Sequence, residues 1–568
     1  MRRITAGICL VAGVISSGVP PALSEDAPQA ESALVDQATL SDAIDLKGAR
    51  PKADPSVITP AVDALPPPLL PLAAPPSLAL PDAPSQVRIH ELRPLTLEES
   101  LQLAEVNSPQ LKAAASRVDQ AKSGLRAAIA AWYPTVDLSA SGLPEYFKSY
   151  SYRNPDFVTN NETYGRQWRV NGSLQVSWDL INPARVPQIA AARDRFERAG
   201  DAYLIALRDL RLEVQTAYFA LQQSDAGVRI GQDSVKASLV SYRDARARFN
   251  AGVNTKLEVL EAETQLARDR NILTTNLRDQ NQQRRNLARV LDLPQDVTPT
   301  AATPARPMGS WEPSLQESIV AAYNYSEELD QLILDISINN SQANASLAAV
   351  QPVVRFVNST SASRTEGQNG QTSRSDIDMG DFTYGVQNST ALTASWRLFD
   401  GGRARAEYRR SKQAAEESRL NFAATRDQIR FQVEQSFLGL RTAVQNIDTT
   451  ASEVLTSRES LRLAQLRVQA GVTTQREVVN TQRDLTQAEL KYARAIRDYN
   501  TNLSELSRRT GLDALVACNA VSLTGTKPEP DQEPIPIEPT PLKSACPSVA
   551  TTGSSVNQTD ITPVQPLW

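Results

Sequence analysis

The fold is decided by Trp178-Asp179-Leu180-Ile181-Asn182-Pro183-Ala184-Arg185, which returns 218 positions later as Trp396-Arg397-Leu398-Phe399-Asp400-Gly401-Gly402-Arg403. Each copy follows a segment in which apolar and polar side chains alternate, and each precedes a long run with helical periodicity. A period of two that gives way to a helical period marks the place where a sheet passes its chain to a helix. Gly401-Gly402 permits positive φ and Pro183 fixes φ, so a turn is predicted in both copies.

Each of these segments reads as a strand with one apolar and one polar face. In the first strand the apolar face holds Val170, Leu174, Val176, Trp178 and Leu180, and the polar face holds Asn171, Ser173, Gln175, Ser177 and Asp179. In the second strand Leu392, Ala394, Trp396 and Leu398 oppose Thr393, Ser395 and Arg397. With two further strands that begin near Thr135 and Val353, the chain is predicted to supply four strands of about ten residues. Polar loops are expected at 143–169 and 360–388.

The sequence between the two ends of the chain consists of two copies of an internal repeat. Thr96-Leu97-Glu98-Glu99 aligns with Ser314-Leu315-Gln316-Glu317 at the offset of 218 found for the tryptophans. Further on, Arg248-Phe249-Asn250-Ala251-Gly252-Val253 aligns with Arg467-Val468-Gln469-Ala470-Gly471-Val472 at an offset of 219. One register held over both stretches predicts a first repeat at 95–293 and a second at 313–512.

Both repeats are predicted to contain the same elements in the same order. Each starts with a capping box, because Thr96 and Ser314 each precede a Glu three residues later. A helix of about two dozen residues and the two strands come next. A long helix follows, at 184–250 or 403–469, and a return helix at 255–291 or 474–506 closes the unit after a tight Gly turn.

The lengths of these helices suggest how they pack. A long helix of about 66 residues spans roughly 100 Å, a return helix of about 37 residues ~55 Å, and the short first helix ~36 Å. The return helix and the first helix, placed end to end, nearly equal the long helix. They are therefore expected to stack beside it as one pseudo-continuous partner and to form a cylinder wall of even height.

The two ends of the chain have a different composition. Residues 1–24 read as a secretory signal peptide, with Arg2-Arg3 before an apolar run that is too short to span a bilayer. Residues 25–94 and 513–568 are rich in proline and are expected to be an extended linker and tail that bury no core. Cys518 and Cys546 remain after removal of the leader, and a disulfide between them is the expectation.

Charge and residue usage exclude several function classes. The net charge of −5 becomes −7 when Arg2 and Arg3 leave with the leader, which argues against nucleic acid as a partner. The single histidine, His90, lies in the linker, so no His-based triad or His cluster for a metal is available. No phosphate-binding loop is present. We expect a protein that is not an enzyme and uses no cofactor or metal.

Four strands with one apolar face cannot close a barrel by themselves. An open sheet edge is not viable in lipid, so closure requires several copies of the chain. The polar faces would then line water and the apolar faces would contact lipid, with Trp178 and Trp396 at an interfacial girdle.

The combination of these motifs resembles the TolC family of outer-membrane efflux proteins. The resemblance covers about 95–512 and rests on three features. They are the junction Leu398-Phe399-Asp400-Gly401-Gly402-Arg403, the two Arg-x-x-Ala-Gly-Val segments at the tips between the long and return helices, and the repeated starts at Thr96 and Ser314. It implies an α+β membrane protein: a homotrimer with a 12-stranded β-barrel continuous with a long α-helical barrel. It also implies an outer-membrane duct with a periplasmic extension, for efflux of small molecules, type I protein secretion or both. The implied partners are a periplasmic membrane-fusion adaptor, an inner-membrane pump of RND or ABC type and outer-membrane lipid.

The resemblance also assigns candidate site residues. The adaptor contact falls on the helical tips, here Ala251, Gly252, Val253, Ala470, Gly471 and Val472. Family pores narrow at acidic residues six and nine positions after the second tip Gly, where this chain has Glu477 and Asn480. The first repeat offers Glu258 and Glu261 at the same spacing. Threefold repetition of these carboxylates would favour cations, although a solvated helix face explains each Glu equally well.

Some alternatives stay open. The aromatic residue and the arginine that close family pores are replaced by Val468 and Thr473, so Arg476 or Lys256 would have to substitute. A structural stalk that tethers the outer membrane to the cell wall is the alternative function, and a receptor acting through the polar loops is a third. Neither the cargo nor the identity of the pump and adaptor follows from the sequence.

Overall fold

The computed structural model describes residues 61, 64–76, 78–89, 91–153, 161–253, 255–371, 381–512 and 515–517. The chain divides into a unit at 1–49 and a unit at 50–568, and all described residues belong to the second. The predicted signal peptide, His90, Cys518 and Cys546 lie outside the described residues.

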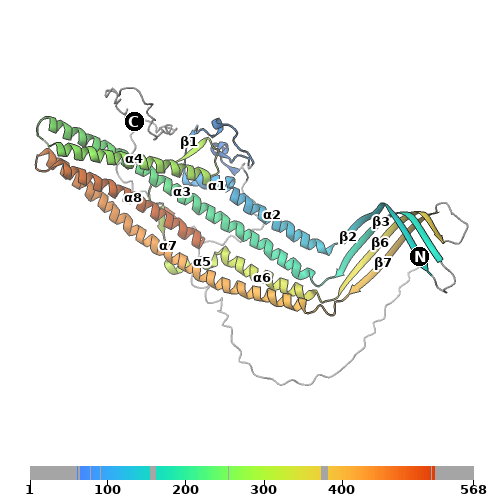
Figure 1. The fold of residues 1–568 in the computed structure, drawn as a ribbon. Coiled ribbons are helices and arrows are strands. Elements are labelled where there is room, and N and C mark those ends of the chain that lie inside the picture. Colours follow the sequence, from blue (N-terminus) through green and yellow to red (C-terminus); the bar gives the residue numbers. More distant parts are fainter. Residues whose placement is uncertain are drawn as a thin grey trace, which may run out of the picture. The chain divides into compact units, whose positions relative to one another are not determined.

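Four antiparallel strands form the main sheet, in the order β2-β3-β6-β7 (Figure 1). They are β2 (Thr135–Arg153), β3 (Asn161–Ile181), β6 (Val353–Gln371) and β7 (Asp381–Ser395). The predicted number of strands is confirmed, but the prediction of about ten residues each was wrong, since they hold 19, 21, 19 and 15 residues. Most of 143–169 and 360–388, expected as loops, therefore belongs to two long hairpins. These segments were not predicted as strands because both of their faces carry polar side chains.

The short helix at the start of each repeat is broken in two. The first repeat has α1 (Leu97–Asn107) and α2 (Pro109–Ile129), and the second has α5 (Leu315–Asn324) and α6 (Glu327–Ala348). Both predicted capping boxes are present, at Thr96 with Glu99 and at Ser314 with Glu317. The single helix expected here was wrong, because Ser108 and Ser326 each cap a new helix through the side-chain oxygen.

The long helices have nearly the predicted bounds. They are α3 (Arg185–Asn250) and α7 (Arg403–Gln469), and their return helices are α4 (Lys256–Val290) and α8 (Gln475–Thr510). Helices α2 and α4 both pack on α3, and α6 and α8 both pack on α7. This confirms the end-to-end stacking expected from the helix lengths. Among the described residues, no helix combines the length and the apolar character needed to cross a bilayer.

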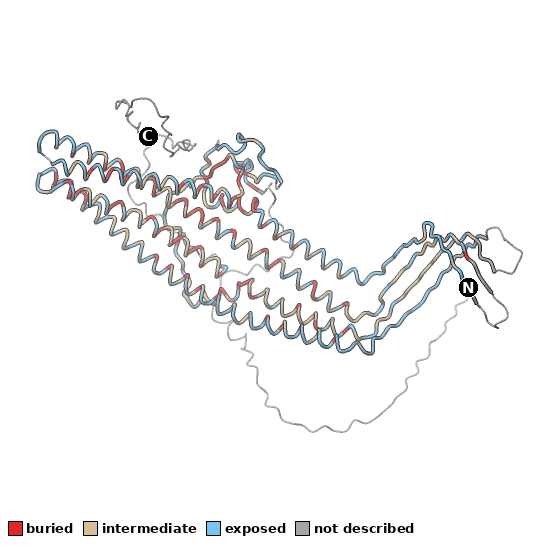
Figure 2. Tube along the Cα trace, viewed as in Figure 1, coloured by how far each residue is buried: buried red, intermediate tan, exposed pale blue. Residues whose placement is uncertain are grey.

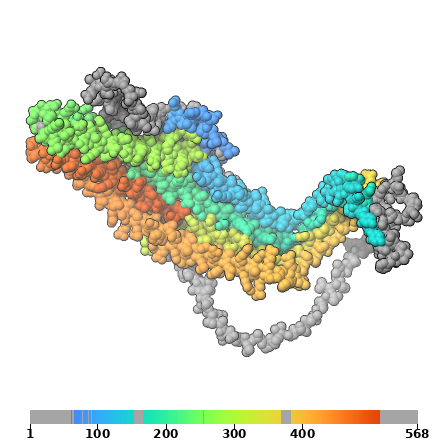
Figure 3. Space-filling model, viewed as in Figure 1, coloured from blue at the N-terminus to red at the C-terminus, as the bar shows by residue number. Residues whose placement is uncertain are grey.

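Contacts place the helices in one layer, with α2 and α4 at one edge, α3 next, then α6 with α8, and α7 at the other edge (Figure 3). Buried residues follow these helices, whereas the strands are mostly exposed or half-buried (Figure 2). The molecule therefore has two open edges. β2 and the α2/α4 column lie at one edge, and β7 and α7 lie at the other.

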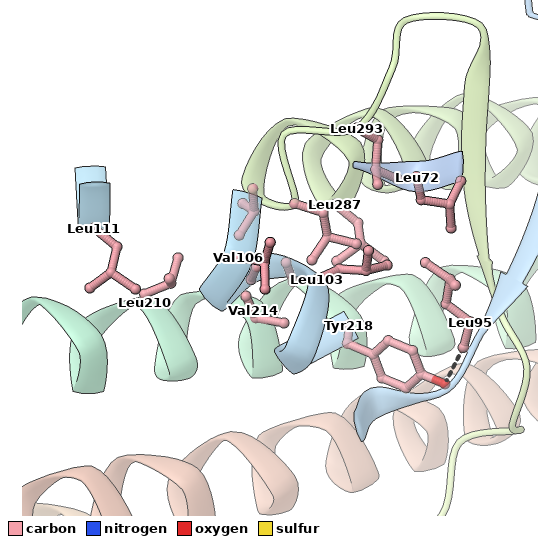
Figure 4. Close-up of a cluster of buried hydrophobic side chains, with 14 of the residues drawn as sticks. Leu72, Leu95, Leu103, Val106, Leu111, Leu210, Val214, Tyr218, Leu287 and Leu293 are labelled. Carbon is pink, nitrogen blue, oxygen red and sulfur yellow. Dashed lines mark hydrogen bonds between the residues drawn. The ribbon is translucent and has the colours of Figure 1, made fainter. Parts of the chain in front are cut away.

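The largest apolar cluster lies where α1, α3 and α4 meet (Figure 4). Tyr218 is buried there and donates its hydroxyl to the carbonyl oxygen of Leu95 at 3.0 Å. Leu95 ends β1 (Glu91–Leu95), which pairs in parallel with β4 (Val297–Ala301). A second cluster between α5, α7 and α8 lies beside β5 (Gly309–Trp311), which pairs with β8 (Leu515–Ala517). Residues 515–517 are thus a strand rather than the start of an extended tail.

Part of the predicted linker belongs to the first core. A 3-10 helix, η3 (Pro67–Leu72), buries Leu69 and Leu72 in the cluster, and Leu65, two residues before this helix, is buried there as well. The expectation that residues 25–94 bury no core was wrong for this segment. Buried Asn107 fixes it, because its Nδ2 donates to the Leu72 carbonyl oxygen at 3.0 Å and its Oδ1 accepts from the Ala74 amide at 2.9 Å.

Charged side chains join the two repeats beside the second core. Arg208 on α3 lies 2.6 Å from Glu327, whose side chain is only 1% exposed. Arg508 on α8 bridges Asp209 and Glu328 at 2.6 and 3.0 Å. Glu327 and Arg508 thus hold the second repeat against the first, and Glu328 pairs with Arg508 within the second repeat.

Candidate functional site

The two helical tips have the same backbone geometry. Gly252 and Gly471 have φ of +76° and +72°. The amide of Val253 donates to the Arg248 carbonyl oxygen and that of Val472 to the Arg467 carbonyl oxygen, both at 2.9 Å. With the bonds from Gly252 and Gly471 to the residues three earlier, these contacts form a Schellman turn at each tip. The turn accounts for the glycine at each tip.

The turn does not account for the valine that follows each glycine. A Schellman turn is commonly accompanied by an apolar contact from this position. Here Val253 is 75% exposed and Val472 is 69% exposed, so neither makes such a contact. Each tip consists of an alanine, a glycine with positive φ and an exposed valine. These residues are Ala251, Gly252 and Val253 in the first repeat and Ala470, Gly471 and Val472 in the second.

The predicted constriction residue Glu261 bonds across the two repeats. Its Oε1 accepts from Nε of Arg476 on α8 at 3.0 Å, and this bond raises the pKa of Arg476. The ion pair crosses a groove of about 330 Å³ between α4 and α8, which is also lined by Leu257, Leu260, Thr264, Arg268, Val479 and Asn480. Close to the tips, Nη1 of Arg248 donates to the Val468 carbonyl oxygen at 3.2 Å. The two hairpins are therefore joined at the groove and again near the tips.

The other two predicted constriction residues lie near the start of their helices. Glu477 bonds within its own hairpin, since its carboxylate lies 2.7 Å from Nη1 of Arg467 and also accepts from the hydroxyl of Thr473. Glu258 is half-buried in the first turn of α4. The three predicted acids thus do not form one cluster within a chain.

The junction between β7 and α7 is built around Asp400, as its motif suggested. Its Oδ2 accepts from the Ala404 amide at 2.8 Å and its Oδ1 from the Gly402 amide at 2.9 Å. These bonds lower the pKa of Asp400. Gly401 and Gly402 have φ of +70° and +86°, as the turn required. Asp400 therefore satisfies free amides at the start of a 67-residue helix.

The equivalent junction in the first repeat contains contacts that the sequence did not reveal. Asp179 Oδ1 accepts from Nε of Arg355 on the neighbouring strand β6 at 2.5 Å. Buried Arg185 donates to the backbone oxygen of Asp179, and its guanidinium lies 4.2 Å from the ring centre of Trp132. The alternation of the strand placed Asp179 on the polar face, but its partner is far away in sequence.

Over most of the sheet, the strand register places apolar residues opposite apolar residues and polar residues opposite polar residues, as the two predicted faces require. Val176 lies opposite Val136 and Leu174 opposite Leu138, while Ser173 lies opposite Ser139 with their hydroxyls 2.7 Å apart. The second hairpin carries an unpredicted polar cluster on the face of Phe356 and Leu392. Its members bond to one another and are Asn358, Thr360, Asn388 and Thr390.

Comparison with known proteins gives a consistent picture. The family described as outer membrane efflux protein matches residues 100–292 and 319–512. Protein CyaE of Bordetella pertussis is 24% identical over 438 residues, which cover 75% of this chain and 85% of that protein. The outer membrane protein VceC of Vibrio cholerae is similar with a TM-score of 0.58 at 16% identity, over 73% of this chain and 96% of VceC. The outer membrane channel CmeC of Campylobacter jejuni is similar with a TM-score of 0.57 at 14% identity, over 78% of this chain and 94% of CmeC.

Proposed function

The chain belongs to the outer membrane efflux protein family, also called the TolC family, and from this premise we propose that three copies close into one duct for efflux. The observation that carries the proposal is the pair of open edges. In the strand order β2-β3-β6-β7, edge strand β7 runs antiparallel to the edge strand β2 of a following copy. A ring of copies therefore continues the antiparallel alternation without a break.

The number three follows from the size of the lumen. Two copies would give eight strands, and an eight-stranded barrel is about filled by its own side chains. Three copies give twelve strands, the smallest number of this series that leaves an open passage. A structural stalk, the alternative function, has no use for four strands with one exposed apolar face.

The tips are proposed as the docking site for a periplasmic adaptor. Val253 and Val472 support this, because two exposed valines at equivalent places have no role in packing. The duct has no source of energy in its own residues on this proposal. An inner-membrane pump of RND or ABC type would supply it, and cargo would be small molecules, secreted protein or both.

Glu258, Glu261 and Glu477 are proposed to line the narrow end of the duct. Three copies would carry each carboxylate three times around one axis, which favours cations. Since Glu261 and Glu477 are paired with arginines in the chain, Glu258 is expected to carry most of this preference.

The test is conductance of the purified protein in planar bilayers, together with its mass in detergent. The proposal expects a particle of three chains and a current that favours cations, with a smaller preference in Glu258→Gln. A folded three-chain particle that passes no current would overturn the proposal. Comparing drug accumulation with the set of exported proteins in a deletion strain separates the two cargo classes.

A further inference from the structure

The seam between the two repeats within one chain carries three polar contacts besides those of Arg208 with Glu327 and of Gln331 with the Arg198 backbone oxygen. It lies between β3 and β6 and continues between α3 and α6. The contacts join Asp179 to Arg355, Arg198 to Asp335 and Asp194 to Ser337. Their lengths are 2.5, 3.0 and 2.6 Å. This seam shows how one repeat contacts the next repeat around the proposed ring.

Shifting residue numbers by the repeat offset of 218 gives the residues expected at the seam between two copies. Adding 218 carries β3 and α3 onto β7 and α7, and subtracting 218 carries β6 and α6 onto β2 and α2. In a ring of copies, β7 and α7 of one copy face β2 and α2 of the next. Each of the three contacts therefore predicts a contact between copies, whereas Arg208 with Glu327 becomes Arg426 with Pro109 and predicts no ion pair.

All three translated contacts bring together opposite charges. Asp179 and Arg355 become Arg397 and Asp137, and Arg198 and Asp335 become Glu416 and Arg117. In both, acid and base have exchanged sides. The third contact, Asp194 with Ser337, becomes Lys412 with Asp119.

We propose that Arg397 pairs with Asp137 of the next copy and Glu416 with Arg117 of the next copy, and that Lys412 with Asp119 reinforces this seam. The inference rests on the ring proposed above and specifies its register. In the single chain Asp137, Arg117 and Arg397 are exposed. Among the described residues, Glu416 forms an ion pair with exposed Arg419 on its own helix, and Lys412 donates to Asn340. Such surface contacts are weak enough to rearrange.

The open end of β7 supports the same seam independently. β3 pairs with β6 and extends to Ile181, which corresponds to Phe399, but β7 ends at Ser395. Phe399 is 86% exposed and Ile181 57%, while Trp396 is 65% exposed and Trp178 41%. A strand of the next copy would cover the residues of the second repeat that β6 covers in the first.

The location gives this seam a function in the duct. Asp179 and Arg355 lie on the polar face of the sheet, which faces the lumen in the proposed barrel. Arg397 and Asp137 lie on the same face, because an offset of 218 keeps the parity of a strand. Three copies would therefore carry a collar of ion pairs of alternating polarity where the barrel meets the helices.

Disulfide cross-linking tests the register. Arg397→Cys and Asp137→Cys are combined in one chain in which Cys9, Cys518 and Cys546 are replaced by serine. Residues opposite each other in antiparallel strands have Cα atoms about 4.5–5.5 Å apart, which a disulfide can bridge. β2 and β7 are the two edges of the sheet, so this pair joins different copies. Oxidation is expected to give bands of two and three chains that disappear on reduction.

The matched control is Asp179→Cys with Arg355→Cys, which occupies the equivalent place inside one chain. It is expected to oxidise equally well and to stay at the mass of one chain. Should Arg397→Cys link to Ser139→Cys and not to Asp137→Cys in a particle of three chains, the register would be overturned and the ring would stand. A folded particle of one chain would overturn both.

Charge exchange tests the pairing itself. Arg397→Asp alone and Asp137→Arg alone bring like charges together at the seam, and each is expected to lower the temperature at which the three-chain particle separates. The two changes combined restore opposite charges and are expected to recover most of that loss. If the combined variant is as unstable as the sum of the single variants, the pairing is refuted.

Discussion

The indole Nε1 of Trp178 donates a hydrogen bond to the carbonyl oxygen of Trp132 at 3.0 Å, which ties the end of β3 to the turn before β2. Trp396 makes the same bond to Val350, again at 3.0 Å and across 46 residues. The two bonds are repeat equivalents. The tryptophans at the junctions therefore have a structural role besides the interfacial role expected from their position in the sequence.

Replacing either tryptophan by phenylalanine removes the donor and keeps an aromatic ring. We expect Trp178→Phe and Trp396→Phe each to cost about 0.5–1.5 kcal/mol, the usual net value of one hydrogen bond. The effects should add, since the two junctions are separate. Heat-dependent gel migration of the assembled protein measures the loss. Unchanged migration in the double variant would show that these bonds contribute nothing.

Glu327→Gln removes a nearly fully buried charge that faces Arg208. The variant leaves the guanidinium without its anionic partner, so we expect a loss of about 3 kcal/mol in the free energy of unfolding. The matched control is Glu459→Gln, whose partner Arg462 is exposed, and little or no loss is expected there. Urea unfolding followed by circular dichroism gives both values, and equal losses would contradict the distinction.

Arg476→Gln breaks the ion pair that joins the two hairpins across the groove. We expect a wider or more mobile narrow end, and hence single-channel conductance raised roughly twofold or more. Arg483→Gln is the control, because Arg483 lies on the same helix and contacts its own neighbour Asp484. The exchange Arg476→Glu with Glu261→Arg should return conductance to the parent level. Equal conductance in all variants would exclude a role for this bond in the opening.

Substitutions of the tip valines are expected to affect adaptor binding, whereas substitutions of the tip glycines are expected to affect stability. Val253→Asp and Val472→Asp change exposed side chains, so we expect unchanged thermal stability and a loss of adaptor binding, measured by co-purification. Gly252→Ala and Gly471→Ala meet no atom within 4 Å, and their cost of about 1 kcal/mol comes from the left-handed backbone. Adaptor binding that survives both aspartate changes would place the docking site elsewhere.

Stability should fall with rising pH because of Asp269, which is buried between α3, α4 and α8. Burial raises the pKa of this carboxyl. Its contribution is therefore fully present below the unfolded pKa, about 3.9, and is lost as pH rises through the folded pKa. Asp269→Asn should abolish this term because an amide does not titrate, and the new amide can donate to the Oε1 of Gln265, which accepts no hydrogen bond among the described residues. We expect the variant to gain stability relative to the parent between about pH 5 and about pH 8.

Thermal unfolding at both pH values measures this difference. The control is Asp279→Asn, a half-buried carboxyl ten residues further along α4 that pairs with exposed Arg278, and this variant should keep the pH dependence of the parent. A parent and an Asp269→Asn variant with parallel pH profiles would show that the buried carboxyl does not contribute.

Much of the fold could be predicted because helix periodicity and capping are local. The bounds of α3 and α7 differ from the prediction by at most one residue, and Thr96 and Ser314 cap helices as their spacing indicated. Long strands were missed because both faces of the outer hairpins are polar, as at Ser359 and Asn388. The burial of Leu69 was missed because a proline-rich composition describes a solvated chain, and only tertiary contacts bury it.

The candidate site was predictable only in part, for the same reason. The left-handed glycines and the capping Asp400 follow from short motifs. The bond between Arg476 and Glu261 joins residues 215 positions apart, and the sequence suggested Arg476 only as one of two substitutes for a missing arginine. Contacts of this kind depend on how two hairpins pack, which periodicity does not specify.

The exchange of acid and base around Asp179 and Arg355 also bears on the ancestry of the gene. If the first half were made alone and formed a ring of six, Asp179 would meet Asp137 and Arg198 would meet Arg117. The second half alone would bring Arg397 against Arg355 and Glu416 against Asp335. These four contacts are repulsive, although Lys412 against Ser337 is not, so on the proposed register each half is expected to prefer the other half to a copy of itself. Splitting the gene should yield two fragments that assemble only when they are expressed together.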